Sequence, residues 1–396
     1  MSESRLTVAE IFRQHKQEFL ERWGHTLSDR PTQTLRDLGT CRTAALGAHL
    51  HQCADCPREV IVYNSCLNRH GPQCGSRARD RWLAARSEEL LPVPYSHVVF
   101  TLPHELIPLA RQNPRVVYNL LFRAASQTLL TIAADPKRLG ARLGFLAVLH
   151  TWDQKLQAHP HLHCLVPAGG LSFDQSRWIP LRHPRFFLPA KVLAAKFRGR
   201  SLGLLRRAHR RGQLQLSGPL LPWQERKAFA RFTWTLQQKD WVVYAKKPLA
   251  GPQHVIRYLA HYTHRVAISN GRLLHWEDGQ VTFRWRDSAH GNRQKVMRLP
   301  AVEFMRRFLL HVLPRGFVKI RHFGYLANRE RKRALRLCST LLPPCSPLEN
   351  HTSALSAPVP APGKCPYCQH GRLVPLARLS AAQLQSRPCP SAFDTS

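Results

Sequence analysis

The stretch that most restricts how this chain can fold is QAHPHLHCLVPAGG, at residues 157–170. Successive side chains of a strand point to opposite faces, so His161 and His163 share one face while Leu162 and Cys164 share the other. The apolar residues predict a central strand, in which two imidazoles present their nitrogens to one place, as in a metal site. A lone His-x-His motif also occurs by chance, so the alternative is two histidines bonded to backbone or water.

The charge of the chain indicates what it binds. Its 396 residues include 59 Lys and Arg against 24 Asp and Glu, a net charge of +35. Such an excess, spread over most of the chain, predicts a polyanionic partner, of which nucleic acid is the first candidate. The sequence has no apolar run of transmembrane length and no signal-peptide core at its start, so we expect no membrane partner and a cytoplasmic location.

Residues 41–75 hold a dense group of cysteines and histidines. In a basic chain expected in the cytoplasm, cysteines favour metal binding over disulfides. A Cys-x-x-Cys pair followed by further ligand residues predicts one structural zinc site. The predicted zinc ligands are Cys53, Cys56, Cys66, His70 and Cys74. The alternative is a set of buried free cysteines and surface histidines.

A second Cys-x-x-Cys pair, Cys365 and Cys368, lies near the C-terminus. No further pair stands beside it in the sequence, so its interpretation as a metal site is weak. The sequence leaves open which residues complete it, the candidates being Cys338, Cys345, His370 and Cys389.

Two tyrosines, Tyr258 and Tyr262, fall at i, i+4 in a helix predicted from about residue 252 to 264. Tyrosine can act as a covalent nucleophile, and a nearby metal can polarise the phosphoryl group that it attacks. The alternative is an ordinary aromatic stripe that packs in a core. In a strongly basic chain with a His-x-His strand, we favour the catalytic interpretation.

The order of predicted elements favours a fold of the α+β class. Predicted strands lie at 95–103, 143–152 and 161–166, and predicted helices at 8–23, 114–135, 189–211 and 222–238. Alternating residues on both sides of Asp278-Gly279 predict a hairpin. A second hairpin is expected after Gly169-Gly170, with residues 171–181 as the partner of the histidine strand.

Several of these motifs together resemble the insertion-sequence (IS) 91 family, the HUH-type (His-hydrophobic-His) rolling-circle transposases with two catalytic tyrosines. The resemblance covers most of the chain, through CRTAALGAHLHQCADC, YNSCLNRHGPQC, VVFTLPHEL, LHTWDQKLQAHPHLHCLVPAGGLS, YLAHYTHRVAISN and a late CPYCQHGRL. It implies an enzyme of the bacterial nucleoid that nicks and joins single-stranded DNA at transposon ends. It also implies an HUH-nuclease-like antiparallel sheet flanked by helices, with an N-terminal zinc-binding module.

The resemblance assigns roles to individual residues. His161 and His163 fall on the paired ligands of a catalytic Mg²⁺ or Mn²⁺, and Tyr258 and Tyr262 fall on the two nucleophiles that form a 5′-phosphotyrosine link. HUH nucleases use a third polar ligand, and two residues of this sequence are candidates for it. Gln154 is the first choice for that ligand and His150 on the preceding strand is the second.

This sequence departs from the family pattern at one position, and the resemblance also implies a division of the chain into domains. The family usually has a cysteine where this sequence has Gly71, which removes one expected zinc ligand. We expect a zinc-binding, DNA-recognition module at 1–94, a catalytic domain at 95–330 and a basic, then Pro/Ser-rich tail at 331–396. Two other functions stay open: a non-catalytic zinc-finger protein that binds DNA, and a metal-dependent nuclease that uses water.

Overall fold

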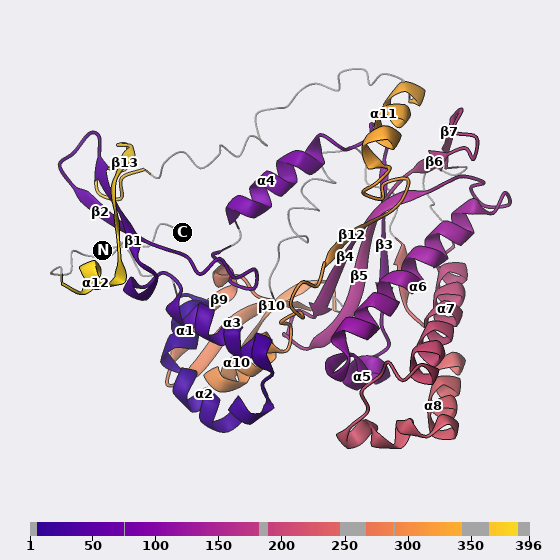
Figure 1. Ribbon diagram of the computed structural model, residues 1–396, viewed down its shortest axis with the longest axis horizontal. Coiled ribbons are helices and arrows are strands. Elements are labelled where there is room, and N and C mark those ends of the chain that lie inside the picture. The colour runs from indigo at the N-terminus through magenta and orange to yellow at the C-terminus, as the bar shows by residue number, and fades with distance from the viewer. Residues whose placement is uncertain are drawn as a thin grey trace.

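A computed structural model describes residues 6–74, 76–181, 189–245, 267–287, 290–342 and 364–386. The described chain combines helices with antiparallel sheets, as the sequence predicted (Figure 1). None of its helices is both apolar enough and long enough to cross a lipid bilayer.

The largest sheet has five strands in the order β12-β4-β5-β3-β8, each antiparallel to its neighbours. These strands are β3 (Tyr95–Thr101), β4 (Gly144–Trp152), β5 (Ala158–Pro167), β8 (Val243–Ala245) and β12 (Ile320–Gly324). The histidine strand is β5, and its position in the middle of the sheet confirms the prediction of a central strand.

The predicted hairpin partner of the histidine strand is wrong. Residues 171–181 do not pair with β5, because β6 (Gly169–Leu171) and β7 (Trp178–Pro180) pair with each other. The neighbours of β5 are β4, which precedes it through a tight turn, and β3, which comes from far earlier in the chain. A pairing between distant segments such as β3 and β5 leaves no local signal in the sequence. The Gly169-Gly170 pair therefore did not indicate the true neighbours of β5.

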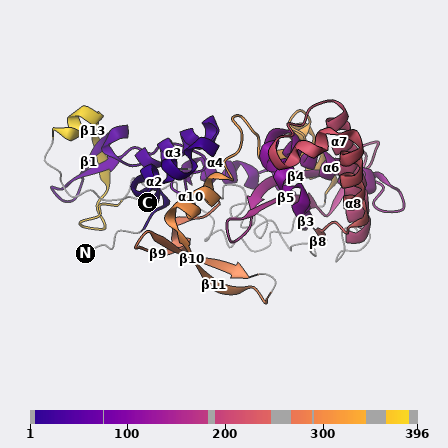
Figure 2. The ribbon, with the colours of Figure 1, turned by 90° about the horizontal axis from the view of Figure 1, so that it is seen from below.

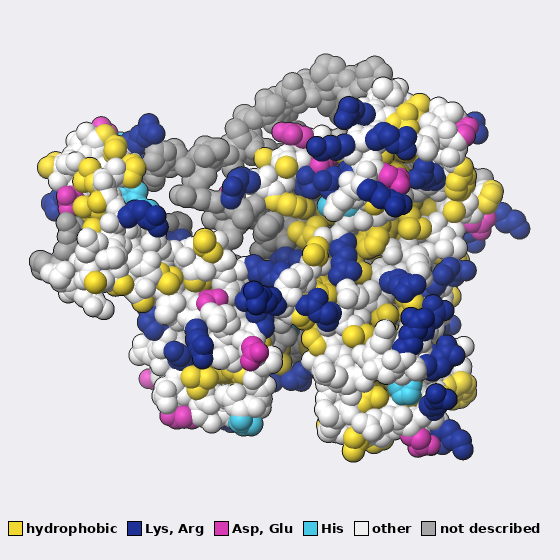
Figure 3. Space-filling model, viewed as in Figure 1, with side chains coloured by type: hydrophobic (Ala, Val, Ile, Leu, Met, Phe, Trp, Pro, Cys, Tyr) yellow, Lys and Arg dark blue, Asp and Glu magenta, His cyan; other side chains and the backbone are white. Residues whose placement is uncertain are grey.

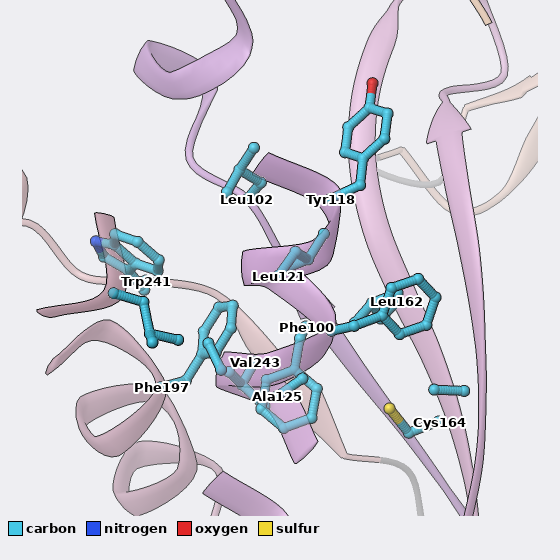
Figure 4. Close-up of a cluster of buried hydrophobic side chains, with 14 of the residues drawn as sticks. Phe100, Leu102, Tyr118, Leu121, Ala125, Leu162, Cys164, Phe197, Trp241 and Val243 are labelled. Atoms are coloured by element: carbon cyan, nitrogen blue, oxygen red, sulfur yellow. The ribbon is translucent and has the colours of Figure 1, made fainter. Parts of the chain in front are cut away.

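One face of this sheet forms the main hydrophobic core. Leu162 and Cys164 of β5 are fully buried there beside Phe100 of β3, against Leu121 and Phe197 from the covering helices (Figure 4). These helices are α5 (Ile107–Gln112), α6 (Pro114–Ala134), α7 (Ala190–Arg210) and α8 (Arg226–Gln238). The last three confirm the helices that the sequence predicted.

The opposite face of the sheet carries the histidines. On the same face, further along β4 and β5, Leu146 and Leu165 pack against Trp82 and Leu83 of α4 (Ser76–Ser87). The sheet therefore lies between α4 on one side and α6 on the other (Figure 1).

A second core joins the N-terminal helices to residues from late in the chain. It packs α1 (Val8–Gln14), α2 (Lys16–Trp23) and α3 (Asp29–Thr40) against α10 (Ala301–Leu309) and a three-stranded sheet. That sheet is β9 (Leu273–Glu277), β10 (Gln280–Asp287) and β11 (Arg293–Pro300). The predicted hairpin at Asp278-Gly279 is confirmed, with φ of 49° and 68° as a two-residue turn requires. The helix predicted at 8–23 is present as two helices, α1 and α2, with a break at His15.

A small three-stranded sheet brings the two ends of the chain together. Its order is β13-β1-β2, from β1 (Ala48–Cys53), β2 (Glu59–Tyr63) and β13 (Leu373–Leu379). Figure 2 shows it at one end of the molecule, with the second core in the middle and the five-stranded sheet at the other end. Two further α-helices of the described chain are α11 (Arg331–Leu341) and α12 (Ala381–Gln385). Segments from all three predicted domains thus share cores, and independent folding of those domains stays a prediction.

Candidate metal centre and cysteine clusters

Three histidines lie close together on the face of the five-stranded sheet that is opposite the main hydrophobic core. His161 and His163 of β5 share this face as predicted, and His150 of β4 lies directly opposite His161 across the strand pair. Their ligand nitrogens all lie within 4.8 Å of one another. The two Nε2 atoms of His161 and His163 are 3.0 Å apart. The strands thus bring three imidazoles to one point.

Hydrogen bonds orient two of these rings. His161 Nδ1 lies 2.6 Å from the carbonyl oxygen of His159, which can only accept, so Nδ1 donates and Nε2 keeps its lone pair. His163 Nδ1 lies 2.9 Å from Nε2 of His97 on β3, and the two rings are stacked. His97 was not predicted as a site residue, because its only signal in the sequence is a single histidine within a predicted strand.

Burial keeps the imidazoles of His161 and His163 neutral. Loss of contact with water lowers the pKa of His161 to about 4, because the charged form is poorly solvated there. Burial, together with the neighbouring rings of His150 and His161, holds the pKa of His163 well below its usual value. Neutral imidazole is the form that binds metal ions, so His161 and His163 are in the binding form at neutral pH.

The spacing of the nitrogens fits a divalent cation. Two nitrogens bound at about 2.1 Å and at right angles around one ion are about 3.0 Å apart. That is the distance found between Nε2 of His161 and Nε2 of His163. An all-imidazole set suits first-row transition metals better than Mg²⁺, which prefers oxygen.

The other predicted residues of this site fall in different places. Gln154, the first choice for a third ligand, lies in the turn between β4 and β5, where its carbonyl oxygen accepts a hydrogen bond from Arg272. The second choice, His150, is the one that the structure places in the cluster. Tyr258 and Tyr262 lie outside the described residues.

The described chain that follows the tyrosines lies near this face. Before them, Ala245 at the end of β8 pairs with Val98 of β3 and packs against the main core on the other face of the sheet. After them, Ala267 lines a small cavity together with Trp152, whose ring stacks on that of His150.

The cysteines form two clusters where the sequence predicted one site. The first cluster holds Cys53, Cys56, Cys365 and Cys368, and the second holds Cys41, Cys66 and Cys74. The predicted grouping of Cys53, Cys56, Cys66 and Cys74 around one ion is therefore wrong. The reason is topological: β13 brings the C-terminal pair to the end of β1, while Cys41 at the end of α3 meets the other two.

His70 is a hydrogen-bonded structural residue and belongs to neither cluster. Its Nδ1 donates to Oδ1 of Asn68, 3.1 Å away, and its Nε2 accepts from the backbone N–H of Leu313 at 3.2 Å. Both ring nitrogens are thus occupied, and burial lowers the pKa of His70 to about 3. The prediction of His70 as a zinc ligand is wrong for this reason.

Gly71 lies against the three-cysteine cluster. A Cβ atom at this position would lie 3.1 Å from Sγ of Cys74 and 3.1 Å from Leu38. A side chain here would point at the cluster, so the glycine leaves one side of it without a ligand.

The surface of the helices beside the five-stranded sheet is rich in positively charged side chains. Dark blue Lys and Arg side chains gather over the helices beside the large sheet in Figure 3. Helix α7 contains no acidic residue and carries Lys191, Lys196, Arg198, Arg200, Arg206, Arg207 and Arg210. Such a surface suits the phosphates of a nucleic acid.

Comparison with known proteins identifies the class. Residues 11–102 match the transposase zinc-binding domain of IS91 elements, and residues 144–334 match a family model described as a putative transposase. The chain is thus an enzyme acting on DNA, with a zinc-binding domain at its N-terminal end. The cysteine clusters agree with structural zinc.

Two relatives define the family. "Putative transposase y4qJ" of Sinorhizobium fredii is 50% identical over 355 residues, which cover 89% of this chain and 88% of the relative. The transposase for insertion sequence element IS801 of Pseudomonas savastanoi pv. phaseolicola is 30% identical over 318 residues, covering 78% and 74%. The chain belongs to the IS91 family of transposases. No solved structure matches it significantly.

Proposed function

We propose that this transposase nicks and rejoins single-stranded DNA at the ends of its insertion element by a rolling-circle mechanism. The observation that carries the proposal is the imidazole cluster of His150, His161 and His163 on the central strand of a five-stranded antiparallel sheet. A His-Leu-His strand between antiparallel neighbours, with helices covering the other face, is the arrangement that we infer to be an HUH-type nuclease fold.

These three histidines would hold one divalent cation, Mn²⁺ or Mg²⁺. When bound, the cation supplies charge that offsets the negative charge of a scissile phosphate. The protein's part is to fix the ligands: the carbonyl of His159 and the ring of His97 orient His161 and His163. Outer hydrogen bonds of this kind set the tautomer and direction of metal-binding histidines.

The covalent chemistry belongs to Tyr258 and Tyr262. The hydroxyl oxygen of one tyrosine attacks phosphorus, its proton passes to a base, and the 3′-oxygen of the preceding nucleotide leaves as a free hydroxyl. The DNA is then joined to the protein by a 5′-phosphotyrosine bond, whose energy is kept for rejoining. A second tyrosine allows another strand to be cut while the first link persists. Ala267, the first described residue after this segment, lines a cavity with Trp152, whose ring stacks on His150, and this supports a place for the segment near the histidine face.

The DNA partner follows from charge and class. The lysines and arginines of α7 and its surroundings would bind phosphates without reading sequence. We place the enzyme with the chromosome in the bacterial cytoplasm, where its substrate lies.

The test is a covalent DNA adduct. Purified protein incubated with Mn²⁺ and a labelled single strand from the element end should give a slow-migrating band after denaturation. Changing both Tyr258→Phe and Tyr262→Phe should abolish the band with little effect on stability, since only hydroxyl groups are lost. The matched control is Tyr63→Phe on β2, which lies in the small sheet and not in the sheet that carries the histidines.

Each outcome has a meaning. A double-Phe protein that still forms the adduct would refute the two tyrosines as nucleophiles. Cleavage by the unaltered protein without any adduct would favour the nuclease that uses water. Binding without cleavage would favour the non-catalytic DNA-binding protein.

A further inference from the structure

Four cysteines from the two ends of the chain meet beside the small sheet. Cys53 ends β1 and Cys56 lies just after it, whereas Cys365 and Cys368 precede β13. Cys56 and Cys365 are 309 positions apart in the sequence. We propose that these four thiolates bind a zinc ion that fastens residues 364–386 to the N-terminal module. Cys365 and Cys368 lie outside both matched ranges, 11–102 and 144–334.

The distances between the sulfur atoms are those of a tetrahedral zinc site. Sγ of Cys53 lies 3.7 Å from Sγ of Cys368, and Sγ of Cys56 lies 3.7 Å from Sγ of Cys365. Four sulfurs at about 2.3 Å from one zinc ion are about 3.8 Å apart. Sulfurs in a disulfide are only about 2.05 Å apart, so these pairs are not disulfides.

The backbone around the cluster is arranged to stabilise thiolates. The N–H of Asp55 donates to Sγ of Cys53 at 3.4 Å, and the N–H of Gly371 donates to Sγ of Cys368 at 3.2 Å. Hydrogen bonds to a charged sulfur favour its deprotonated form, which is the form that binds metal.

Gly371 shows how closely the second loop is fitted to the first. A Cβ atom at Gly371 would lie 2.3 Å from Sγ of Cys53 and 2.9 Å from Sγ of Cys368. Only glycine fits there, because its backbone must pass directly over the sulfurs. The loop itself is closed by hydrogen bonds of 2.8 Å from Cys365 to Gly371 and from Gln369 to Cys365.

The small sheet has too little apolar core to hold the C-terminal segment by itself. One cluster of buried residues contains Ala48, Leu50, Ile61 and Leu379, and the other contains Cys53, Val60, Cys365 and Leu373. The middle of β13 is exposed, including Val374 and Leu376. Units this small usually depend on a metal for their stability, and the free energy of metal binding then becomes free energy of folding.

The three-cysteine cluster is a separate site. Sγ of Cys74 lies 3.2 Å from Sγ of Cys41 and 3.4 Å from Sγ of Cys66. We therefore expect two zinc ions in each chain, of which one depends on the C-terminal pair. Neither site depends on the proposed nicking chemistry.

The experiment counts zinc in full-length protein purified without chelators. Elemental analysis should find two zinc ions per chain, and the double variant Cys365→Ser/Cys368→Ser should keep one. The pair Cys53→Ser/Cys56→Ser should lose the same single ion. The matched control is Cys338→Ala, which removes a buried thiol outside both clusters and should keep two ions.

Hydrogen exchange provides a readout that does not depend on activity. In the Cys365→Ser/Cys368→Ser protein, amides of β1 and β13 should exchange faster, while those of β4 and β5 keep their protection and report intact folding. A double variant with as much zinc as the unaltered protein would overturn the proposal, as would a zinc-free unaltered protein. A single zinc per chain that disappears in the double variant would support it.

Discussion

His97 is predicted to orient a metal ligand without touching the metal itself. Its Nε2 lies 2.9 Å from Nδ1 of His163, and its side chain is buried. For Nε2 of His163 to bind the cation through its lone pair, Nδ1 has to carry the proton and donate a hydrogen bond to Nε2 of His97. Replacing His97 by Phe keeps a flat ring stacked on His163 but removes the acceptor.

The size of the effect follows from this bond. A buried N–H left without an acceptor costs about 1–3 kcal/mol. Removal of an outer partner from a metal-binding histidine typically lowers metal affinity by about 10- to 100-fold. Since tenfold in affinity is about 1.4 kcal/mol, the two ranges agree. We expect His97→Phe to weaken Mn²⁺ binding by one to two orders of magnitude.

Direct Mn²⁺ titration by calorimetry measures this change, and DNA nicking at rising Mn²⁺ concentrations measures it independently. His97→Phe should shift the half-saturating concentration upward and reach nearly the normal rate at high Mn²⁺. His97→Gln, whose amide reaches the position of Nε2, should recover part of the affinity. The control is Ser96→Ala, which removes a buried hydroxyl without a hydrogen-bond partner in the described chain. An unchanged midpoint in His97→Phe would refute the reasoning.

Two further predictions concern the ligands themselves. His161→Ala and His163→Ala should each lower metal-dependent nicking by at least ~100-fold while leaving DNA binding, measured by gel shift, nearly unchanged, because binding rests on distributed phosphate contacts. Full nicking by either variant would exclude it as a ligand. Gly71→Cys should slow the loss of zinc to a chelator, because the new side chain points at Sγ of Cys74. Zinc release at the rate of Gly71→Ala would show that the added sulfur does not coordinate.

Local patterns in the sequence determined much of the fold. Alternation along β5 placed His161 and His163 opposite Leu162 and Cys164, and the structure keeps that division between the polar face and the core. The hairpin at Asp278-Gly279 and helices α6, α7 and α8 also agree, since turn residues and helical periodicity act over a few positions. The motifs identified the family, because their order along the chain is itself sequence information.

Only the tertiary structure decided which distant residues meet. It set His150 rather than Gln154 beside His161 and brought His97 to His163 from another strand. It also separated Cys53 and Cys56 from the cluster of Cys41, Cys66 and Cys74 and joined them to a pair more than 300 positions away. Spacing along a chain says which side chains are neighbours on one element. Contacts between elements depend on strand order and on the packing of cores, and these arise only when the whole chain folds.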